Sequence, residues 1–580
     1  MTLLPQLATR LERLYPNQGD VLAAKVDALL QPFLPADGVS REGSPPPGGE
    51  PWSERDVVLI SYADQLRSDA TTPLATLADW LQTTGLDQLL SIVHLLPFCP
   101  YSSDDGFSVI DFEAVDADAG DWDDIARLGR QVDLMFDLVL NHVSRHSEWF
   151  RGYLAGESPY VDWFIRADPD GDYSQVVRPR SLPLLTPVET TRGVRHVWTT
   201  FSDDQIDLNY ANPQVLLRML HVLLEYARRG ARIVRLDAVA FLWKQVGTTC
   251  LHLPETHEVV KLMREVVQAA FPQTVLLTET NVPHAENVSY FGDGDEAQMV
   301  YQFSLPPLLL DAFVHGDATY LQRWLEQLAP PPPGCTFFNF TASHDGVGVR
   351  PLEGLVPPER LDRLVEAMAE RGGLIGTRRR ADGVDVPYEL NISYVDALAP
   401  NPRNEPPDVA LHARRFLTSQ AVMMSLPGMP AVYFHSLVGT RNDYAGVAAS
   451  GINRRINRHK YELGELEAIL GDDDSLGARI HAGYRALLAA RRSEPAFHPD
   501  APVRVLAAPA PSMLTLLRSS RDGARSVLLA ANFGDADVAI RPADLAELAA
   551  PPRDLFSGNP CEECVLPAGG FAWLAVRSQS

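Results

Sequence analysis

Polar side chains that could do chemistry stand at the ends of apolar segments in this chain. Arg235 and Asp237 end one such segment, Glu279 follows a second, and His344 and Asp345 follow a third. A buried carboxylate without a partner is costly, so three carboxylates at such positions need an explanation beyond stability. Cleavage of a glycosidic bond is one explanation, because it uses two carboxyl groups in opposite protonation states. Ion pairing within the scaffold is the alternative.

The neighbours of the first two carboxyl groups suggest which of them carries the proton. Asp237 is expected to be ionised, because Arg235 would lower its pKa and fix its orientation. Glu279 follows an apolar run and is expected to be the protonated general acid. Spacing along the chain does not distinguish retention from inversion of the anomeric centre, since that depends on a carboxyl separation of roughly 5–5.5 Å or 6.5–9.5 Å.

The apolar segments that precede these residues alternate with longer amphipathic stretches, which is typical of βα units around a parallel sheet. We therefore predict an α/β fold, a (β/α)8 TIM barrel whose chemistry lies at the carboxyl ends of its strands. The predicted strands are Val57–Tyr62, Ile92–Leu96, Leu134–Leu140, Ile233–Leu236, Val275–Thr278, Met299–Phe303, Thr336–Phe340 and Ala431–Phe434.

The spacing of these strands leaves room for additional domains. Two gaps are too long for plain βα connections, which predicts inserted subdomains after strands three and seven. Short alternating runs near the end predict an antiparallel β domain. The expected segments are a helical extension and linker (1–52), the barrel (53–142, 211–345 and 411–498), an inserted domain B (143–210), a second insertion (346–410) and the C-terminal β domain (499–580).

Charge and composition limit the partners of the protein. The 580 residues carry a formal net charge of −25, which argues against nucleic acid or an anionic membrane as partner. A small-molecule sugar is compatible with this field. The chain has no run of about 20 apolar residues, and residues 1–16 lack the features of a signal peptide. We expect a cytoplasmic protein, whose oligomeric state cannot be read from the sequence.

Nothing in the sequence predicts a metal or an organic cofactor. The five cysteines are too few for a disulfide framework. Cys561 and Cys564 form an isolated C-x-x-C, which we interpret as a loop with two thiols rather than a metal site. His142 and His146 lack the glutamate that accompanies two histidines in the H-E-x-x-H zinc motif.

Four segments together resemble the signature regions of the α-amylase superfamily (glycoside hydrolase family 13) of retaining glycosidases. They are Asp137–His142, Ile233–Asp237, Leu276–Glu279 and Phe340–Asp345. A finer resemblance is to the sucrose phosphorylase branch, whose members transfer a glucosyl group to inorganic phosphate. The segments that carry it are Ser103–Phe107, Gly120–Asp124, Arg178–Arg180, Asp237–Val239, Leu305–Pro307, Asp345–Gly346 and Ile456–Arg458.

This resemblance implies a double displacement and a role for each matching residue. Asp237 would be the nucleophile, Glu279 the general acid/base, and Asp345 the third carboxylate, which holds sugar hydroxyls. Arg180 matches a phosphate-contacting arginine, for which the alternative is a solvated loop residue, and Tyr388 matches a tyrosine that assists it. The positions that match residues around the glucosyl unit are Asp104, His142, Gln205, Arg235, His344 and Arg454.

The acceptor side departs from the sucrose phosphorylase pattern. Asn281 replaces a histidine, segment 347–356 lacks an inserted stretch, and Val386 and Glu389 replace polar residues that would contact fructose. These features most resemble branch members that act on 2-O-α-D-glucosylglycerate, whose carboxylate suits an arginine.

Several other readings stay open. The acceptor could also be that of glucosylglycerol or of sucrose. The loop arginines Arg378–Arg380 belong to the same pattern, although a solvated loop tip explains them as well. An α-glucosidase or transglucosidase, and a catalytically silent sugar-binding protein on the same fold, are further alternatives.

Overall fold

The computed structural model describes residues 3–34, 50–180, 182–379, 384–400, 408–545 and 551–577. Most of the predicted linker lies outside the described residues, and so does Arg380 of the predicted arginine cluster.

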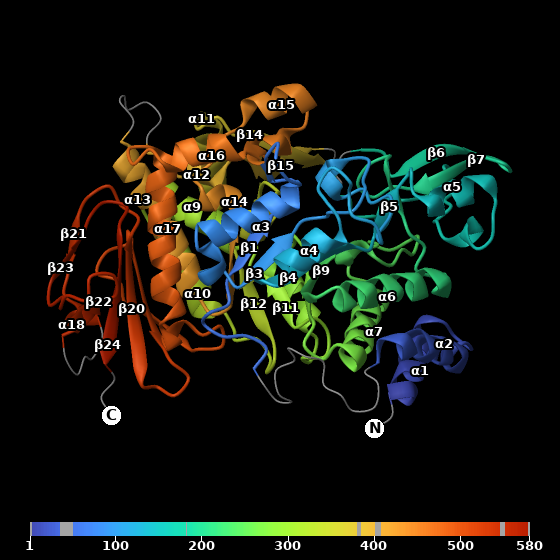
Figure 1. Cartoon of the computed structure of the whole chain (residues 1–580), viewed down its shortest axis with the longest axis horizontal. Helices are drawn as coiled ribbons and strands as arrows, with labels where there is room; N and C mark the ends of the chain where they lie inside the picture. The colour runs from blue at the N-terminus through green and yellow to red at the C-terminus, as the bar shows by residue number, and fades with distance from the viewer. Residues whose placement is uncertain are drawn as a thin grey trace.

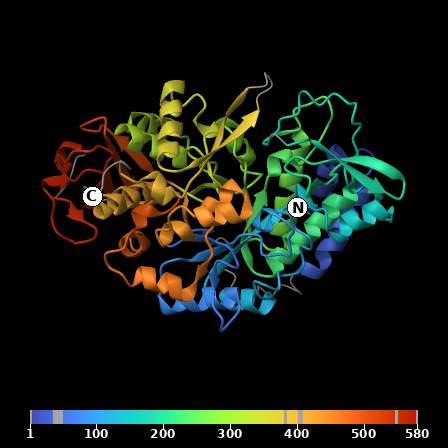
Figure 2. The ribbon, with the colours of Figure 1, turned by 90° about the horizontal axis from the view of Figure 1, so that it is seen from above.

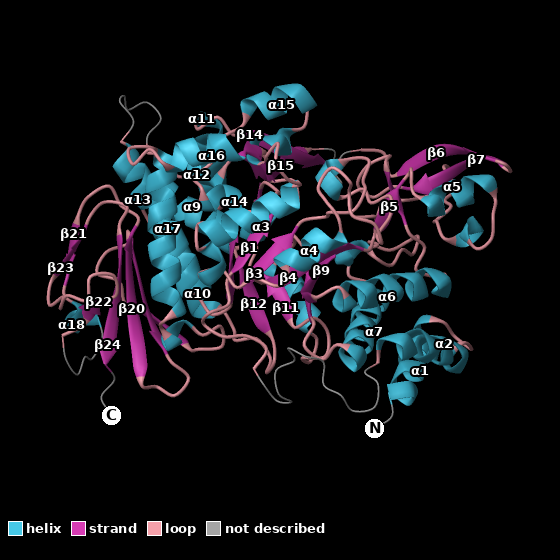
Figure 3. Ribbon diagram, in the orientation of Figure 1, coloured by secondary structure: helices cyan, strands magenta, loops and turns pink. Residues whose placement is uncertain are grey.

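A closed barrel of eight parallel strands forms the centre of the molecule (Figures 1 and 3), which confirms the predicted fold class. The strand order around it is β1-β16-β12-β11-β10-β9-β4-β3. Nearly every strand residue is buried, because helices and side chains cover both faces of a parallel barrel. The strands are β1 Val58–Ser61, β3 Ile92–Leu95, β4 Asp133–Val139, β9 Ala231–Asp237, β10 Val275–Thr278, β11 Met299–Tyr301, β12 Thr336–Asn339 and β16 Met429–Tyr433.

Helices pack around the outside of the barrel. Capping residues stabilise the first turns of several helices. Asn212 caps α6, whose first residue is Pro213, and Asp121 forms a capping box with Asp124 at the start of α4. The main outer helices are α3 Pro73–Thr83, α4 Trp122–Leu128, α6 Pro213–Arg228, α7 Pro254–Ala270, α8 His284–Val288, α9 Leu305–His315, α10 Thr319–Gln327, α13 Val409–Ser425, α16 Leu463–Leu470 and α17 Leu476–Arg492.

Two excursions from the barrel lie on the same side of it in Figure 1. The first pairs β5 with β8 and contains the hairpin β6–β7, and the second is a three-stranded sheet of order β13-β15-β14 with a helix. Because both stand near the carboxyl ends of the strands, they form walls above the barrel mouth. Their elements are β5 His142–Ser144, α5 Glu148–Ala155, β6 Leu185–Thr190, β7 Gly193–Trp198, β8 Gln205–Asp207, β13 Val347–Gly348, α11 Pro358–Glu370, β14 Leu374–Arg379, β15 Asp385–Asn391 and α12 Tyr394–Ala397.

Short elements follow the last barrel strand, and one of them, α15, lies beside β14 of the second excursion in Figure 1. A small parallel pair, β17 with β2, ties this connection back to the first βα loop. The elements are β2 Leu66–Arg67, α14 Phe434–Leu437, α15 Tyr444–Ser450 and β17 Tyr461–Glu462.

The predicted antiparallel domain at the C-terminal end is present as a five-stranded sheet of order β18-β19-β20-β24-β22. Figure 2 shows it at one end of the molecule, with the first excursion at the opposite end. Its inner face is anchored to the barrel layer, where the Trp573 indole donates to Ser425 Oγ at 2.8 Å. The elements are β18 Val503–Leu506, β19 Met513–Ser519, β20 Arg525–Asn532, β21 Val538–Ile540, α18 Pro542–Leu545, β22 Arg553–Asp554, β23 Cys564–Leu566 and β24 Phe571–Arg577.

The helical pattern at the start of the chain is divided into two helices, α1 (Leu3–Leu14) and α2 (Gly19–Leu30). The break falls at Asn17, whose φ of 65° lies in the left-handed region. The hairpin packs on the barrel helices. Arg10 donates to Glu265 at 2.7 Å and to Glu258 at 3.1 Å, both on α7.

The sequence interpretation of the C-x-x-C segment as two thiols is wrong. Cys561 and Cys564 form a disulfide, because the turn between them brings their Cα atoms to 6.0 Å, within the range of such bonds. Cys99, Cys250 and Cys335 are free and buried. Within the part of the chain that the structure describes, no helix is long and apolar enough to cross a membrane, and no group of three or more His, Cys, Asp or Glu side chains is arranged to hold a metal ion.

Candidate active site

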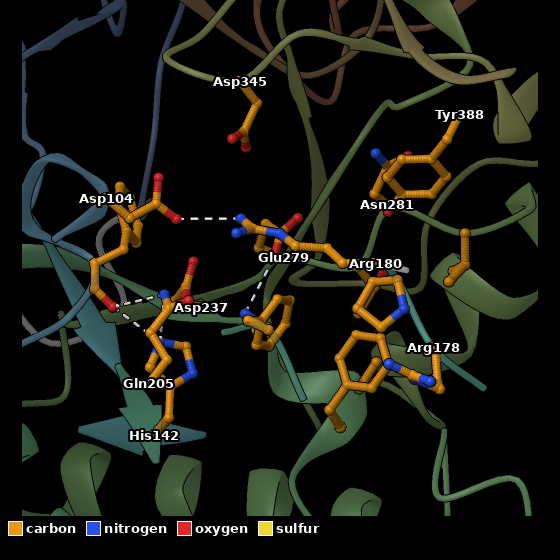
Figure 4. Close-up of a pocket in the computed structure, with 18 of the residues that line it drawn as sticks. Asp104, His142, Arg178, Arg180, Gln205, Asp237, Glu279, Asn281, Asp345 and Tyr388 are labelled. Carbon is orange, nitrogen blue, oxygen red and sulfur yellow. Dashed lines mark hydrogen bonds and ion pairs between the residues drawn. The ribbon is translucent and has the colours of Figure 1, made fainter. Parts of the chain in front are cut away.

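The residues to which the resemblance assigns catalytic, sugar-binding or phosphate-binding roles, together with Asn281, line one pocket at the carboxyl ends of the barrel strands. Asp237 is the last residue of β9, and Glu279 follows β10, the neighbouring strand in the barrel. Figure 4 shows most of the lining side chains converging on the pocket. The predicted residues in its wall are Asp237, Glu279, Asp345, Asp104, His142, Gln205, Arg235, His344, Arg454, Asn281, Arg180 and Tyr388.

Arg235 gathers three carboxylates around one buried guanidinium. Its Nη1 lies 2.5 Å from Asp137 Oδ1 and 2.7 Å from Asp237 Oδ1, and its Nη2 lies 3.8 Å from Glu279 Oε2. His94 holds the second oxygen of Asp137 at 2.7 Å. Asp137 and His94 therefore orient the arginine, and the arginine orients Asp237.

Burial changes the expected protonation of the two neighbouring carboxyls. It raises the pKa of Asp237, although Arg235 opposes the rise, and it raises the pKa of Glu279 in the same way. The sequence-based expectation of a lowered pKa for Asp237 is therefore wrong, because the cost of desolvating the charge exceeds the attraction of one shared guanidinium. Two coupled carboxyls of this kind share one proton near neutral pH. Since Arg235 lies closer to Asp237 than to Glu279, it favours the charge on Asp237 and the proton on Glu279.

The pKa of Asp345 is lowered, in contrast to the raised pKa values of Asp237 and Glu279. Burial would raise its pKa, but Arg454, with Nη1 2.6 Å from Asp345 Oδ1, and more distant cations hold that pKa well below its usual range. Glu389 in turn binds Arg454 through two hydrogen bonds, which it accepts from Nη2 at 2.8 Å and from Nε at 3.2 Å. Glu389 also accepts from the backbone N–H of Gly346 at 3.1 Å. This chain of contacts connects β15 of the second excursion to an ionised carboxylate in the pocket.

Residues that match sugar-binding positions form a second group, fixed by the loop that contains Phe107. His142 Nε2 lies 2.8 Å from the Phe107 carbonyl oxygen, and Gln205 Nε2 donates to the same oxygen at 3.2 Å. The His344 ring stacks on the Phe107 ring at 4.5 Å, and burial lowers the pKa of His344 to about 3. His344 is therefore neutral across the physiological range, as a donor or acceptor to uncharged hydroxyls requires.

Two residues of the pocket wall, Asp104 and Ala238, and the neighbouring Asp105 have a strained backbone. Asp104, Asp105 and Ala238 have φ values of 53°, 48° and 51°, in the left-handed region that residues other than glycine rarely adopt. Buried Arg458 stabilises two of them, with Nη1 2.7 Å from Asp105 and 3.4 Å from Asp104. Strain of this kind costs about 1–3 kcal/mol per residue and is typical of sites where position matters more than stability.

Asn281, Tyr388 and Arg180 lie beyond Glu279, away from His142 and Gln205 (Figure 4). Asn281 packs so closely on β13 that a Cβ at Gly348 would meet its Nδ2 at 2.5 Å. Burial raises the pKa of Tyr388 to about 12, so its hydroxyl remains protonated. Arg180 reaches back across the pocket and places Nη2 3.2 Å from Asp104 Oδ2.

Sequence reasoning assigned no role to several residues in and around the site. Arg178 occurs in a segment that carries the resemblance, and Glu389 was named only as a departure on the acceptor side, so the sequence held a signal for both. Buried Lys244 gave no signal: its Nζ lies 2.6 Å from Asp207 and 2.5 Å from Asn141, which fixes the strand that carries His142. Arg378, one of the loop arginines that the sequence pattern included, also lines the pocket. The other lining residues that were not predicted are Phe107, Val177, Pro179, Phe201, Ala238, Ala240, Phe241, Thr280, Val282 and Arg350.

A family model, curated proteins and a solved structure that are similar to this chain all point to the same family of enzymes. Residues 79–324 match the model of the alpha amylase catalytic domain. The chain is 49% identical to a glucosylglycerate phosphorylase of Spirochaeta thermophila over 485 residues, which cover 84% of this chain and 81% of the relative. It is 50% identical to a glucosylglycerate phosphorylase of Escherichia coli K12 over 455 residues, which cover 77% and 80%. The crystal structure of sucrose 6F-phosphate phosphorylase from Thermoanaerobacter thermosaccharolyticum superposes with a TM-score of 0.71 at 26% identity, covering 83% of this chain and 94% of that one.

Proposed function

The chain belongs to the α-amylase family, among its glucosylglycerate phosphorylase relatives, and from this premise we propose that it catalyses the reversible phosphorolysis of 2-O-α-D-glucosylglycerate. The products are D-glycerate and α-D-glucose 1-phosphate. The observation that carries the proposal is the arrangement of Asp237 and Glu279 around one guanidinium, with Asp345 held ionised beside them.

The first half-reaction uses the shared proton of the buried pair. The Asp237 carboxylate attacks the anomeric carbon, and the bond from that carbon to the glycerate oxygen breaks. Glu279 gives its proton to the leaving oxygen, which departs as the glycerate hydroxyl. The result is a covalent glucosyl ester on Asp237, the intermediate of a retaining mechanism.

The second half-reaction returns the enzyme to its starting state. A phosphate oxygen attacks the anomeric carbon from the side that glycerate has left, the ester bond to Asp237 breaks, and the phosphate proton passes to Glu279. We assign contacts with phosphate to Arg180 and the protonated hydroxyl of Tyr388, which line this side of the pocket. Two inversions at the same carbon retain the α configuration.

The remaining predicted residues bind the glucosyl unit. Asp345, kept ionised by Arg454, accepts from sugar hydroxyls and stabilises positive charge on the ring as the bond breaks. We assign the contacts of the other hydroxyls to Asp104, His142, Gln205, Arg235, His344 and Arg454, and contact with the acceptor to Asn281. The cytoplasmic location remains a prediction.

The proposal is tested by measuring α-D-glucose 1-phosphate released from glucosylglycerate, glucosylglycerol and sucrose in parallel, each with and without phosphate. We expect phosphate-dependent release, fastest from glucosylglycerate, and an α-configured product in the proton NMR spectrum. Glucose released at the same rate without phosphate would instead identify a hydrolase, and a preference for either other donor would refute the assigned acceptor.

A further inference from the structure

The arginines that line the pocket differ in their partners. Five of them have a carboxylate oxygen within 4 Å: Arg180 with Asp104, Arg235 with Asp237, Arg350 with Glu286, Arg378 with Glu353 and Arg454 with Asp345. Arg178 is the exception, since no carboxylate of the described residues lies within that distance of its guanidinium. In a protein with a net charge of −25, a cation without a partner inside a pocket is unusual.

The surroundings of Arg178 make this exception costly. The side chain is half-buried, and its Nε is shielded from solvent without a hydrogen-bond partner among the described residues. Burial lowers the pKa of Arg178, and no acidic side chain in the described part of the chain opposes the effect. Desolvating a cation without a partner is unfavourable, so the arrangement is explained best if an anion from outside completes it.

The segment that carries Arg178 is held in place before any ligand arrives. The N–H of Val177 donates to the carbonyl of Thr249 at 3.0 Å, which ties the segment to the connection after β9. Pro179 restricts the backbone of the residue before it to extended conformations. A positioned guanidinium loses little entropy when it binds a carboxylate through two parallel hydrogen bonds.

The location of Arg178 indicates which part of the substrate it meets. In Figure 4, Arg178 and Asn281 both lie on the far side of Glu279 from Asp104, Asn281 above and Arg178 below. Glu279 protonates the leaving oxygen, so the acceptor occupies the space beyond it. The glycerate carboxylate is attached to the carbon that bears this oxygen and projects into that space. Arg180, in contrast, points back to Asp104 and the reacting centre.

We propose that Arg178 binds the carboxylate of the glycerate acceptor and so selects glycerate over the neutral glycerol. This rests on the proposed phosphorolysis of glucosylglycerate. A donor that carries a hydroxymethyl group in place of the carboxylate leaves the guanidinium buried without a partner, which discriminates more strongly than a missing apolar contact.

The test compares wild type with Arg178→Ala on glucosylglycerate and glucosylglycerol. We expect kcat/KM for glucosylglycerate to fall roughly 10- to 100-fold, as for the loss of a charged hydrogen bond, with less than about a threefold change for glucosylglycerol. Arg178→Lys, which keeps the charge, should recover part of the loss. Arg195→Ala is the matched control, because Arg195 is exposed on β7 of the same excursion and lies outside this pocket.

Two further measurements separate the possible failures. Calorimetric titration with D-glycerate should show weaker binding to Arg178→Ala by a similar factor, and an unchanged Kd overturns the proposal. With α-glucosyl fluoride as donor, which carries no carboxylate, KM for phosphate should be unchanged; a loss confined to this arm makes Arg178 a phosphate ligand instead. Absence of phosphate-dependent turnover by the wild type refutes the proposed function rather than this assignment, which the glycerate titration still tests.

Discussion

Replacement of Arg454 by methionine should make catalysis depend on pH in a way that the wild type does not. Arg454 lies between Asp345 and Glu389 and is the first of the cations that keep the pKa of Asp345 low. Methionine fills a similar volume without the charge. The pKa of Asp345 should then rise, because the cations that remain to oppose burial, Arg458 at 4.0 Å and Arg235, are more distant than Arg454.

The distances set the size of the effect. At 2.6 Å, the attraction between the Arg454 and Asp345 charges is about 6 kcal/mol with an effective dielectric constant of about 20. Desolvation of both groups cancels part of this, and breaking such a pair typically costs about 3–5 kcal/mol. If most of that cost appears in the transition state, kcat/KM falls by roughly 100- to 1000-fold at neutral pH.

The assay is the pH profile of kcat/KM for phosphorolysis by wild type and Arg454→Met. A raised pKa means that the ionised form of Asp345 exists only at higher pH, so the variant should recover activity as the pH rises, whereas the wild type keeps Asp345 ionised down to low pH. Arg455→Met is the control, since Arg455 pairs with Asp105 at 3.1 Å and does not line the pocket. An equal loss at every pH, with an unchanged profile, would refute the electrostatic reasoning.

Three more substitutions test the assigned roles. Asp237→Asn should abolish turnover, and measurable turnover would show that Asp237 is not the nucleophile. The substitution removes a buried carboxyl whose raised pKa makes the folded state less stable as the pH rises. It should therefore also raise the melting temperature, most strongly at alkaline pH. Glu279→Gln should slow phosphorolysis of glucosylglycerate by roughly 100- to 10,000-fold but spare α-glucosyl fluoride, whose leaving group needs no proton, so equal losses on both donors would contradict its role as general acid. Arg180→Ala should impair phosphate use, seen as a raised KM for phosphate, more than the slow hydrolysis of the glucosyl ester, and a parallel loss of both would count against phosphate binding.

The barrel could be predicted from the sequence because each parallel strand that is buried on both faces is a short, continuous run of apolar residues. Every predicted strand overlaps an observed one, and the ends differ by at most two residues, as at β16, where the strand begins at Met429 rather than Ala431. The clustering of the polar residues at the strand ends could be predicted as well, since a barrel brings the carboxyl ends of its strands together. The convergence of Asp237, Glu279 and Asp345 in one pocket is the result.

Other features depend on distances that the sequence does not contain. Arg235 stands two positions before Asp237, which suggested a lowered pKa, but the degree of burial decides the sign. Arg178 and Arg180 look equivalent in the sequence. Only their positions in the fold show that Asp104 neutralises Arg180, whereas Arg178 has no carboxylate partner among the residues that the structure describes. Local turns also produce the break between α1 and α2 at Asn17 and the pairing of Cys561 with Cys564. The periodicity of apolar residues does not predict such turns.

The way in which the barrel closes has a consequence for how the protein is made on the ribosome. Strand β1 pairs on one side with β3 and on the other with β16, where Val58 lies opposite Ala431. At a translation rate of about 5–20 residues per second, β1 emerges roughly 20 to 75 seconds before the strand that completes its pairing. During that interval the growing sheet has an open edge, which is the kind of surface that aggregates or recruits chaperones. The N-terminal hairpin, whose partner helix α7 is synthesised well before β16, can dock early and bury part of the unfinished barrel while the nascent chain waits for its last strand.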